Sequence, residues 1–137
     1  PEVTAAVSAV SAVPKVRAML VRHQRQAVAD AQHASGGVVV EGRDIGTVVL
    51  PDADLKVFLV ADPAVRAQRR AAEDRARGLA TDVSATAAAL TSRDQADSTR
   101  TVSPLEQAAD AVVVDGTNDD LDTVIARVAD LVRGVQT

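Results

Sequence analysis

Three short apolar runs constrain the fold of this chain more than any other feature of its sequence. They are Val38–Val40, Leu55–Val60 and Ala111–Val114, and segments with helical spacing lie between them. Strands that are apolar along almost their whole length are typical of parallel sheets whose two faces are covered by helices. The sequence therefore predicts an α/β fold with a parallel sheet, although three strands are few for a chain so rich in predicted helix.

The segments between these runs carry the start and stop signals of helices. Asp62 and Pro63 supply an N-cap and a proline for a first helical turn, and Gly78 is suited to end that helix. Thr81 or Asp82 can cap the helix that follows. The predicted helices span approximately residues 2–12, 14–31, 63–77, 82–99 and 120–133.

Two of these helices have a predicted inward face. In the second helix, which begins near Pro14 and stops before Gly36, the inward residues are Val16, Met19 and Leu20. The last helix carries a longer apolar stripe of helical period. The stripe consists of Leu121, Val124, Ile125, Val128, Leu131 and Val132.

Composition excludes several classes of protein. Phe58 is the only aromatic residue and the net charge is −4, so base stacking is available only at Phe58 and no basic surface exists to hold nucleic acid. The absence of cysteine excludes disulfides and thiolate chemistry, and His23 and His33 have no metal-ligand spacing, so no metal site is expected. No signal peptide or membrane-length apolar run is visible. We therefore expect a cytoplasmic protein whose 137 residues form one domain.

The loop Glu41–Thr47 is the first candidate for chemistry, because it directly follows a predicted strand. Ligands of open α/β sheets bind beyond the carboxyl ends of strands. Arg43 offers a planar fork that suits a phosphate, and Asp44 offers two acceptors that suit an amino group. A surface loop with an internal Arg–Asp pair explains the same residues equally well.

Three further groups of polar residues have helical or pocket-forming spacing. Arg93, Asp97 and Arg100 share one helix face, where a solvated ion-pair ladder is the simpler interpretation. Arg66, Arg69 and Arg70 share another face and could bind phosphates, or could be a basic surface tempered by nearby acidic residues. Ser8 and Arg17 flank the break at Pro14, and alone they indicate only a helix surface.

Taken together and in order, these segments resemble bacterial cytidylate kinases over the whole chain. Val39–Ala53, which reads V-V-E-G-R-D-I-G-T-V-V-L-P-D-A, is very similar to the most recognisable internal motif of that family. Ser8–Arg17 and Ser92–Arg100 resemble two other family segments, and Arg66–Arg70 resembles the start of its mobile lid. The resemblance implies a P-loop nucleoside-monophosphate-kinase-like three-layer fold, with residues 1–137 forming one partial kinase domain that lacks the N-terminal strands and has a lid at about residues 63–100.

The resemblance also implies an activity and roles for individual residues. The family transfers a phosphoryl group from ATP to CMP or dCMP with Mg²⁺ and is typically monomeric. Cytosine recognition falls to Ser8, Arg17 and Asp44, the pentose to Arg93 and Asp97, and the α-phosphate to Arg43 and Arg100. On the donor side, Arg66 and Arg70 are the expected catalytic arginines, Arg69 contacts ATP phosphates, and Asp115, Gly116 and Thr117 lie near adenine.

The family's P-loop motif, G-x-x-x-x-G-K-[ST], does not occur in this sequence, in which Lys15 and Lys56 are the only lysines. We therefore expect this chain alone to be inactive. In the family's sheet the P-loop strand separates the strands that correspond to Val38–Glu41 and Leu55–Val60. Unpaired backbone groups on those strands would cost about 1–3 kcal/mol each if buried. We expect the chain alone to be unstable or to be completed, for instance by self-association through exposed strand edges.

Two other interpretations stay open from the sequence. The chain could be a truncated, non-catalytic module that keeps its affinity for CMP, or a structural fragment that binds nothing specific. A different nucleotide or small-molecule kinase of the P-loop class is disfavoured, because the run E-G-R-D-I-G-T-V-V is not typical of adenylate or shikimate kinases.

Overall fold

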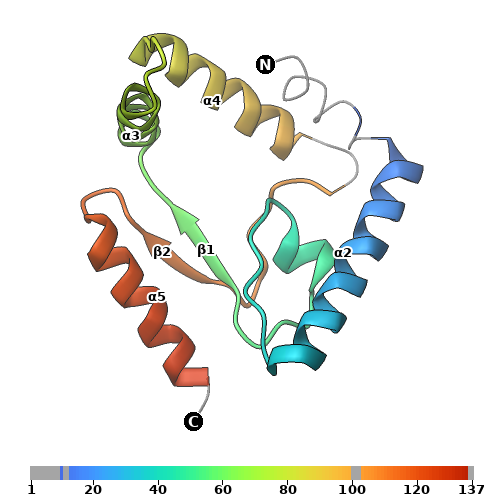
Figure 1. Ribbon diagram of the computed structural model, residues 1–137. Helices are drawn as coiled ribbons and strands as arrows, with labels where there is room; N and C mark the ends of the chain where they lie inside the picture. Colours follow the sequence, from blue (N-terminus) through green and yellow to red (C-terminus); the bar gives the residue numbers. More distant parts are fainter. Residues whose placement is uncertain (1–9, 11–12, 100–102, 136–137) are drawn as a thin grey trace. The chain divides into compact units, whose positions relative to one another are not determined.

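The chain divides into two units in the computed structural model, which describes residue 10 and residues 13–99 and 103–135 (Figure 1). Unit 1 consists of residues 1–53 and 97–108, and unit 2 of residues 54–96 and 109–137. The predicted first helix, at about residues 2–12, lies outside the described residues except for Val10. No helix in the described ranges is long and apolar enough to span a bilayer.

Unit 2 is built on a parallel pair of strands, β1 (Val57–Val60) and β2 (Val112–Asp115). Val57 faces Val112 in the ladder, and Val60 faces Asp115. The ladder continues past the strand ends, because the amide of Val112 donates to Lys56 O at 2.9 Å and that of Gly116 to Val60 O at 2.9 Å. Two of the three predicted strands and their parallel pairing are therefore confirmed.

The predicted strand at Val38–Val40 is wrong. These residues form no ladder, and Val39 is 95% exposed. A strand is stabilised by the hydrogen bonds of a neighbouring strand, and the sheet formed within the described part of the chain contains β1 and β2 alone. An apolar run without a partner strand therefore stays a loop.

The helices of unit 2 begin and end close to where their signals lie. In α3 (Pro63–Ala76) the Asp62 carboxylate accepts from the amides of Ala64 at 2.8 Å and Val65 at 3.3 Å. In α4 (Val83–Ser98) Asp82 accepts from the amide of Ser84 at 2.9 Å, so Asp82 rather than Thr81 is the capping side chain. The third helix, α5 (Leu121–Val135), follows β2 and contacts it (Figure 1).

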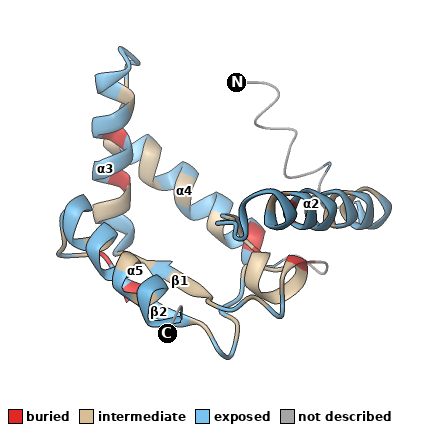
Figure 2. Ribbon diagram, turned by 60° about the horizontal axis from the view of Figure 1, so that its bottom comes forward, coloured by how far each residue is buried: buried red, intermediate tan, exposed pale blue. Residues whose placement is uncertain are grey.

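The apolar core of unit 2 is small. Ala67 and Ala71 of α3 and Val114 of β2 are buried, whereas Leu121 and Ile125 of the α5 stripe are exposed. The strands are only partly covered within the described residues, since most of β2 is exposed as well (Figure 2). The expected stripe exists on α5, but none of its residues is fully buried, and only some of them, such as Val124 and Val128, are partly shielded from solvent.

Unit 1 contains the long helix α2 (Pro14–Ser35) and a single π-helical turn, η1 (Ile45–Val49). Pro14 occupies the first turn of α2, and Gly36 ends it with a left-handed φ of 75°, as the sequence predicts. Met19, predicted to point inward, is 54% exposed. Val28 on α2 and Val49 on η1 are the buried apolar residues of this unit, and α2 lies beside η1 (Figure 1).

Candidate functional site

Unit 1 buries two carboxylates, which is a costly arrangement in so small a core. Asp44 is 6% exposed and Asp97 is 1% exposed. Aspartate is almost never fully buried unless it is paired, because desolvation of its charge must be offset by an opposite charge or hydrogen bonds. The surroundings of these two side chains therefore define the first candidate site.

Asp44 is paired with Arg17, which reaches it from α2. The Arg17 Nη2 group donates to Asp44 Oδ2, and its Nε donates to Ser103 Oγ at 3.1 Å. Ser103 is buried and has a φ of 57°, which is unusual for a residue other than glycine. One guanidinium thus joins residues from three distant parts of the sequence into a single polar cluster.

Asp97, in the last turn of α4, forms an ion pair with Arg43 from the loop that precedes η1. The Arg43 Nε and Asp97 Oδ2 atoms are 3.4 Å apart. The backbone carbonyl of Asp97 accepts from the amide of Leu105 at 2.9 Å, which fixes the chain just after Ser103. Unit 1 thus brings Arg17, Arg43, Asp44 and Asp97 into two ion pairs, in which the carboxylates are buried.

The other residues predicted for this site are Arg93, Ser8 and Arg100. Arg93 lies one helical turn before Asp97 on α4. Ser8 and Arg100 lie outside the described residues. The predicted surface ladder of Arg93, Asp97 and Arg100 is wrong for Asp97, because this carboxylate is buried and pairs with Arg43.

Sequence reasoning missed two residues of unit 1. Ser103 contacts Arg17 across 86 positions of sequence, and its only local cue is the turn-forming pair with Pro104. Arg25 of α2 donates from Nε to Val49 O and from Nη2 to Val48 O, both at 2.8 Å. No motif marks Arg25, since it contacts backbone atoms that every residue type possesses.

Unit 2 has a cavity of about 300 Å³ beyond the carboxyl ends of its strands. In parallel α/β sheets this edge is where ligands bind. Its lining combines apolar side chains with Arg66, Arg69 and the turn that follows β2. The lining residues are Leu59, Val60, Ala61, Arg66, Arg69, Gly116, Asp119, Asp120, Leu121 and Val124.

Arg69 ties α3 to the turn at residues 116–119. Its Nη2 group donates to Gly116 O at 2.8 Å, Asp119 O at 2.8 Å and Thr117 O at 3.4 Å. The hydroxyl of Thr117 in turn accepts from the amide of Asp62 at 2.9 Å. The structure therefore brings the predicted residues Arg69, Gly116 and Thr117 together, and Arg69 and Gly116 line the cavity.

Gly116 leaves little room for a side chain at this wall. A Cβ atom at this position would lie 3.2 Å from Val124 Cγ2 and 3.9 Å from Arg69 Nη1. Gly116 is itself buried. The turn therefore needs the smallest residue where it passes between α3 and α5.

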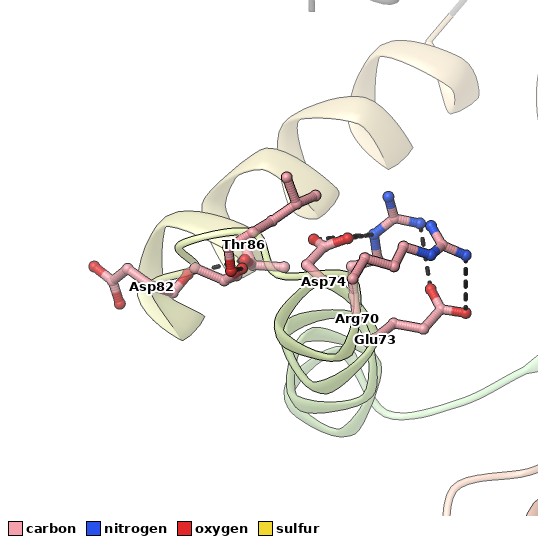
Figure 3. Close-up of polar contacts among 8 residues, drawn as sticks. Arg70, Glu73, Asp74, Asp82 and Thr86 are labelled. Carbon is pink, nitrogen blue, oxygen red and sulfur yellow. Dashed lines mark hydrogen bonds and ion pairs between the residues drawn. The ribbon is translucent and has the colours of Figure 1, made fainter.

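Arg66 and Arg70 face carboxylates of unit 2. Arg66 Nη1 lies 2.5 Å from Asp94 Oδ2 on α4. Arg70 Nε lies 3.2 Å from Asp74 Oδ1, and Arg70 Nη1 lies 3.5 Å from Glu73 Oε2 (Figure 3). The acidic neighbours thus neutralise the basic face of α3, and the three arginines hold three different sets of acceptors.

Carboxylates at the ends of elements of unit 2 have lowered pKa values. Hydrogen bonds from the hydroxyl and then the amide of Thr117 lower the pKa of Asp115, and those of Thr123 lower the pKa of Asp120. Hydrogen bonds from Ser84 lower the pKa of Asp82. A hydrogen bond from Lys56, whose Nζ lies 2.7 Å from Asp110 Oδ2, lowers the pKa of Asp110.

Potential metal-ligating side chains do not cluster in the described ranges. These ranges contain no group of three or more His, Cys, Asp or Glu side chains that could hold an ion.

A parallel pair of strands combined with helices fits the α/β fold of the P-loop nucleoside monophosphate kinases. Residues 1–134 match the cytidylate kinase family. The chain belongs to this family.

Named relatives agree with the match. A cytidylate kinase of Streptomyces griseus subsp. griseus is 56% identical over 133 residues, which cover 97% of this chain and 54% of that protein. A cytidylate kinase of Lactiplantibacillus plantarum is 47% identical over 137 residues, covering 100% of this chain and 58% of the relative. One from Bradyrhizobium sp. (strain ORS 278) is 44% identical over 135 residues, covering 98% and 62%. The chain spans about half the length of the curated relatives it matches.

Proposed function

We propose that the protein to which this chain belongs transfers a phosphoryl group from ATP to CMP or dCMP, giving ADP and CDP or dCDP, in the cytoplasm. The two ion pairs of unit 1 that involve buried carboxylates, Arg17–Asp44 and Arg43–Asp97, carry the proposal. Their desolvation is hard to account for by stability alone, since buried ion pairs contribute little net stability. A ligand with an amino group, hydroxyls and a phosphate matches their chemistry.

Asp44 is the proposed reader of the base. An exocyclic amino group donates to a carboxylate, whereas the carbonyl that uracil has at the same position repels it. A buried carboxylate left without its donor costs free energy, so discrimination between the two bases can be strong. Arg17, held by Asp44 and Ser103, lies beside this carboxylate and is the proposed second contact to the base, with Ser8 as a third.

The sugar and phosphate of the acceptor are assigned to the second ion pair and its neighbours. Asp97 and Arg93 are the proposed partners of the pentose hydroxyls. Arg43 and Arg100 are the proposed partners of the α-phosphate, for which a planar guanidinium provides two parallel donors. The CMP phosphate oxygen attacks the γ-phosphorus of ATP directly, and no protein nucleophile is required.

Unit 2 is the proposed donor side and lid. The cavity lined by Gly116 and Arg69 is the proposed place of the ATP base and its adjoining groups, with Asp115 and Thr117 beside Gly116 in the sequence. Arg66 and Arg70 are the proposed catalytic arginines, which would exchange their carboxylate partners for the charge that spreads over the transferring phosphoryl group. Mg²⁺ normally accompanies ATP and neutralises its phosphates, but we assign no residue of this chain to it.

Titration of the protein with CMP and UMP, followed by calorimetry, tests the acceptor site. We expect CMP to bind at least about tenfold more tightly than UMP, and Asp44→Asn to remove most of this preference. Equal affinity of the unsubstituted protein for the two nucleotides would refute the role of Asp44. A coupled assay for ADP release with CMP and ATP tests the reaction.

A non-catalytic nucleotide-binding module is the second candidate. The lack of a G-x-x-x-x-G-K-[ST] motif in the sequence favours it for this chain taken alone, and exposed residues such as Leu59 and Val113 favour self-association of such a chain. CMP binding without ADP release by the 137-residue chain supports this candidate, whereas turnover by that chain refutes it.

A further inference from the structure

Arg25 is an arginine of unit 1 to which no role has been given, yet its contacts are as well formed as those of the proposed ligand-binding residues. Its Nε and Nη2 groups donate to two successive carbonyls, those of Val49 and Val48, both at 2.8 Å. Adjacent donors of one planar guanidinium make such a fork geometrically specific. The side chain therefore fixes both the position and the orientation of the peptides it contacts.

These carbonyls belong to the last residues of η1, where a helical turn leaves its carbonyl groups without intrahelical partners. A single turn of five residues is not stable by itself, because nucleation of helical structure is unfavourable. A cation at the C-terminal end of a helical turn is favourable electrostatically as well. Arg25, on α2, thus supplies the hydrogen-bond donors that the last carbonyls of η1 lack within the turn itself.

The same two residues hold the backbone of Asp44 at the other end of the turn. Asp44 O accepts from the amide of Val48 at 2.9 Å and from that of Val49 at 3.2 Å. The peptides of Val48 and Val49 are therefore bonded on one side to Asp44 and on the other to Arg25. Val49 is also 1% exposed, so its side chain anchors the turn in the core of unit 1.

The helix α2 consequently contacts Asp44 in two ways. Arg17 binds its carboxylate, and Arg25, eight residues later on α2, holds the turn to which its backbone belongs. Eight residues correspond to about 12 Å along a helix and to a rotation of about 80° around it, which keeps both side chains on one broad face of α2. A rigid helix with two arginines on this face can fix both the side chain and the main chain of Asp44.

We infer that Arg25 is a positioning residue for Asp44 and thereby helps to set the preference for a pyrimidine that bears an amino group. This inference rests on the proposed role of Asp44 in reading the base. Arg25 itself touches no ligand in this arrangement. It keeps the buried carboxylate at the place and angle that an amino donor requires.

The experiment compares the unsubstituted protein with Arg25→Gln and Arg25→Lys. Arg22→Gln, on the same helix, removes the same charge from a residue that makes none of these contacts, and is the matched control. Amide hydrogen exchange of Val48 and Val49 is measured without nucleotide. Dissociation constants for CMP and UMP are measured in parallel.

We expect Arg25→Gln to speed exchange at Val48 and Val49 about tenfold or more and to reduce the ratio of UMP to CMP dissociation constants by about tenfold. For Arg25→Lys, the exchange rate and the ratio of dissociation constants should lie between those of the unsubstituted protein and those of Arg25→Gln, because one ammonium cannot reproduce the planar fork. Arg22→Gln should leave both measurements unchanged. Arg25→Lys alone decides the test if Arg25→Gln does not fold.

Unchanged exchange and unchanged base preference in both Arg25 variants would overturn the inference. Faster exchange with an unchanged preference would also overturn it, because the turn would then be loosened without consequence for Asp44. If the unsubstituted protein does not distinguish CMP from UMP, the proposed role of Asp44 fails, and the inference falls with it even where exchange confirms the link between Arg25 and η1.

Discussion

Arg17 and Asp44 form a buried ion pair, and the two partners are not equivalent when one of them is removed. Arg17→Met leaves the Asp44 carboxylate buried with its principal cation gone, so we expect unit 1 to lose about 3 kcal/mol of stability in denaturant unfolding. The double variant Arg17→Met/Asp44→Leu should recover most of this loss, because it removes both charges. A single variant as stable as the unsubstituted protein would contradict the buried pair.

Gly116 permits a second prediction, at the wall of the cavity in unit 2. Gly116→Ala places a methyl group 3.2 Å from Val124 Cγ2, which should cost about 1 kcal/mol through overpacking. We expect weaker ATP binding and unchanged CMP binding, measured by calorimetry. Gly134→Ala, where a Cβ would meet no atom within 4 Å, is the control. Equal losses for both nucleotides would place the effect in global stability.

Sequence reasoning identified the charged residues of the site more readily than their supporting residues. Arg17, Arg43, Asp44 and Asp97 lie in segments with family-like spacing, and the structure brings them into two ion pairs. Arg25 escaped notice because it binds carbonyl oxygens, which leave no trace in the residue types of the segment they belong to.

At the scale of the elements, we can predict how much the capping residue of α3, Asp62, contributes to stability. Asp62→Ala removes the acceptor of two amides at the start of α3, so we expect a loss of about 1 kcal/mol in thermal or denaturant unfolding. Asp62→Asn keeps a side-chain acceptor and should lose only a fraction of that amount. If Asp62→Asn proves as harmful as Asp62→Ala, charge and not capping explains the effect.

The sequence predicted the ends of those helices whose caps and stop signals lie within a few residues of the helix end. Pro14, Gly36, Asp62 and Asp82 each act within a few residues of sequence, and the observed ends of α2, α3 and α4 follow them. The strand at Val38–Val40 failed because strand formation depends on a distant partner. The turn η1 was not predicted, because the donors that reach its last carbonyls come from Arg25 on another element.

On the scale of the whole molecule, acid should weaken unit 2. Asp82, Asp110, Asp115 and Asp120 all belong to this unit, and each has a pKa below its ordinary value of 3.8. A carboxylate whose folded pKa is lowered stabilises the fold above its unfolded pKa, and this contribution is lost as the pH falls through the folded value. We therefore expect the amides of unit 2 to lose protection below about pH 4.

Hydrogen exchange of residues 109–135 at pH 5 and pH 3 provides the measurement. Asp115→Asn should exchange faster than the unsubstituted protein at pH 5, and this difference should narrow at pH 3. A difference that stays constant over this interval would mean that ionisation of Asp115 is irrelevant to the stability of unit 2.

The bonds of Arg69 also determine where a moving lid can bend. The N-terminal turns of α3 are joined to the turn at residues 116–119 twice, once through the amide of Asp62 and once through the guanidinium of Arg69. A hinge between residues 62 and 69 would leave the Asp62 bond intact but would have to break the bonds of Arg69 at each closure, at about 1 kcal/mol or more for each bond of a guanidinium. Closure of the proposed lid therefore requires a hinge beyond Arg69, and the start of α3 stays with the strands as a fixed support.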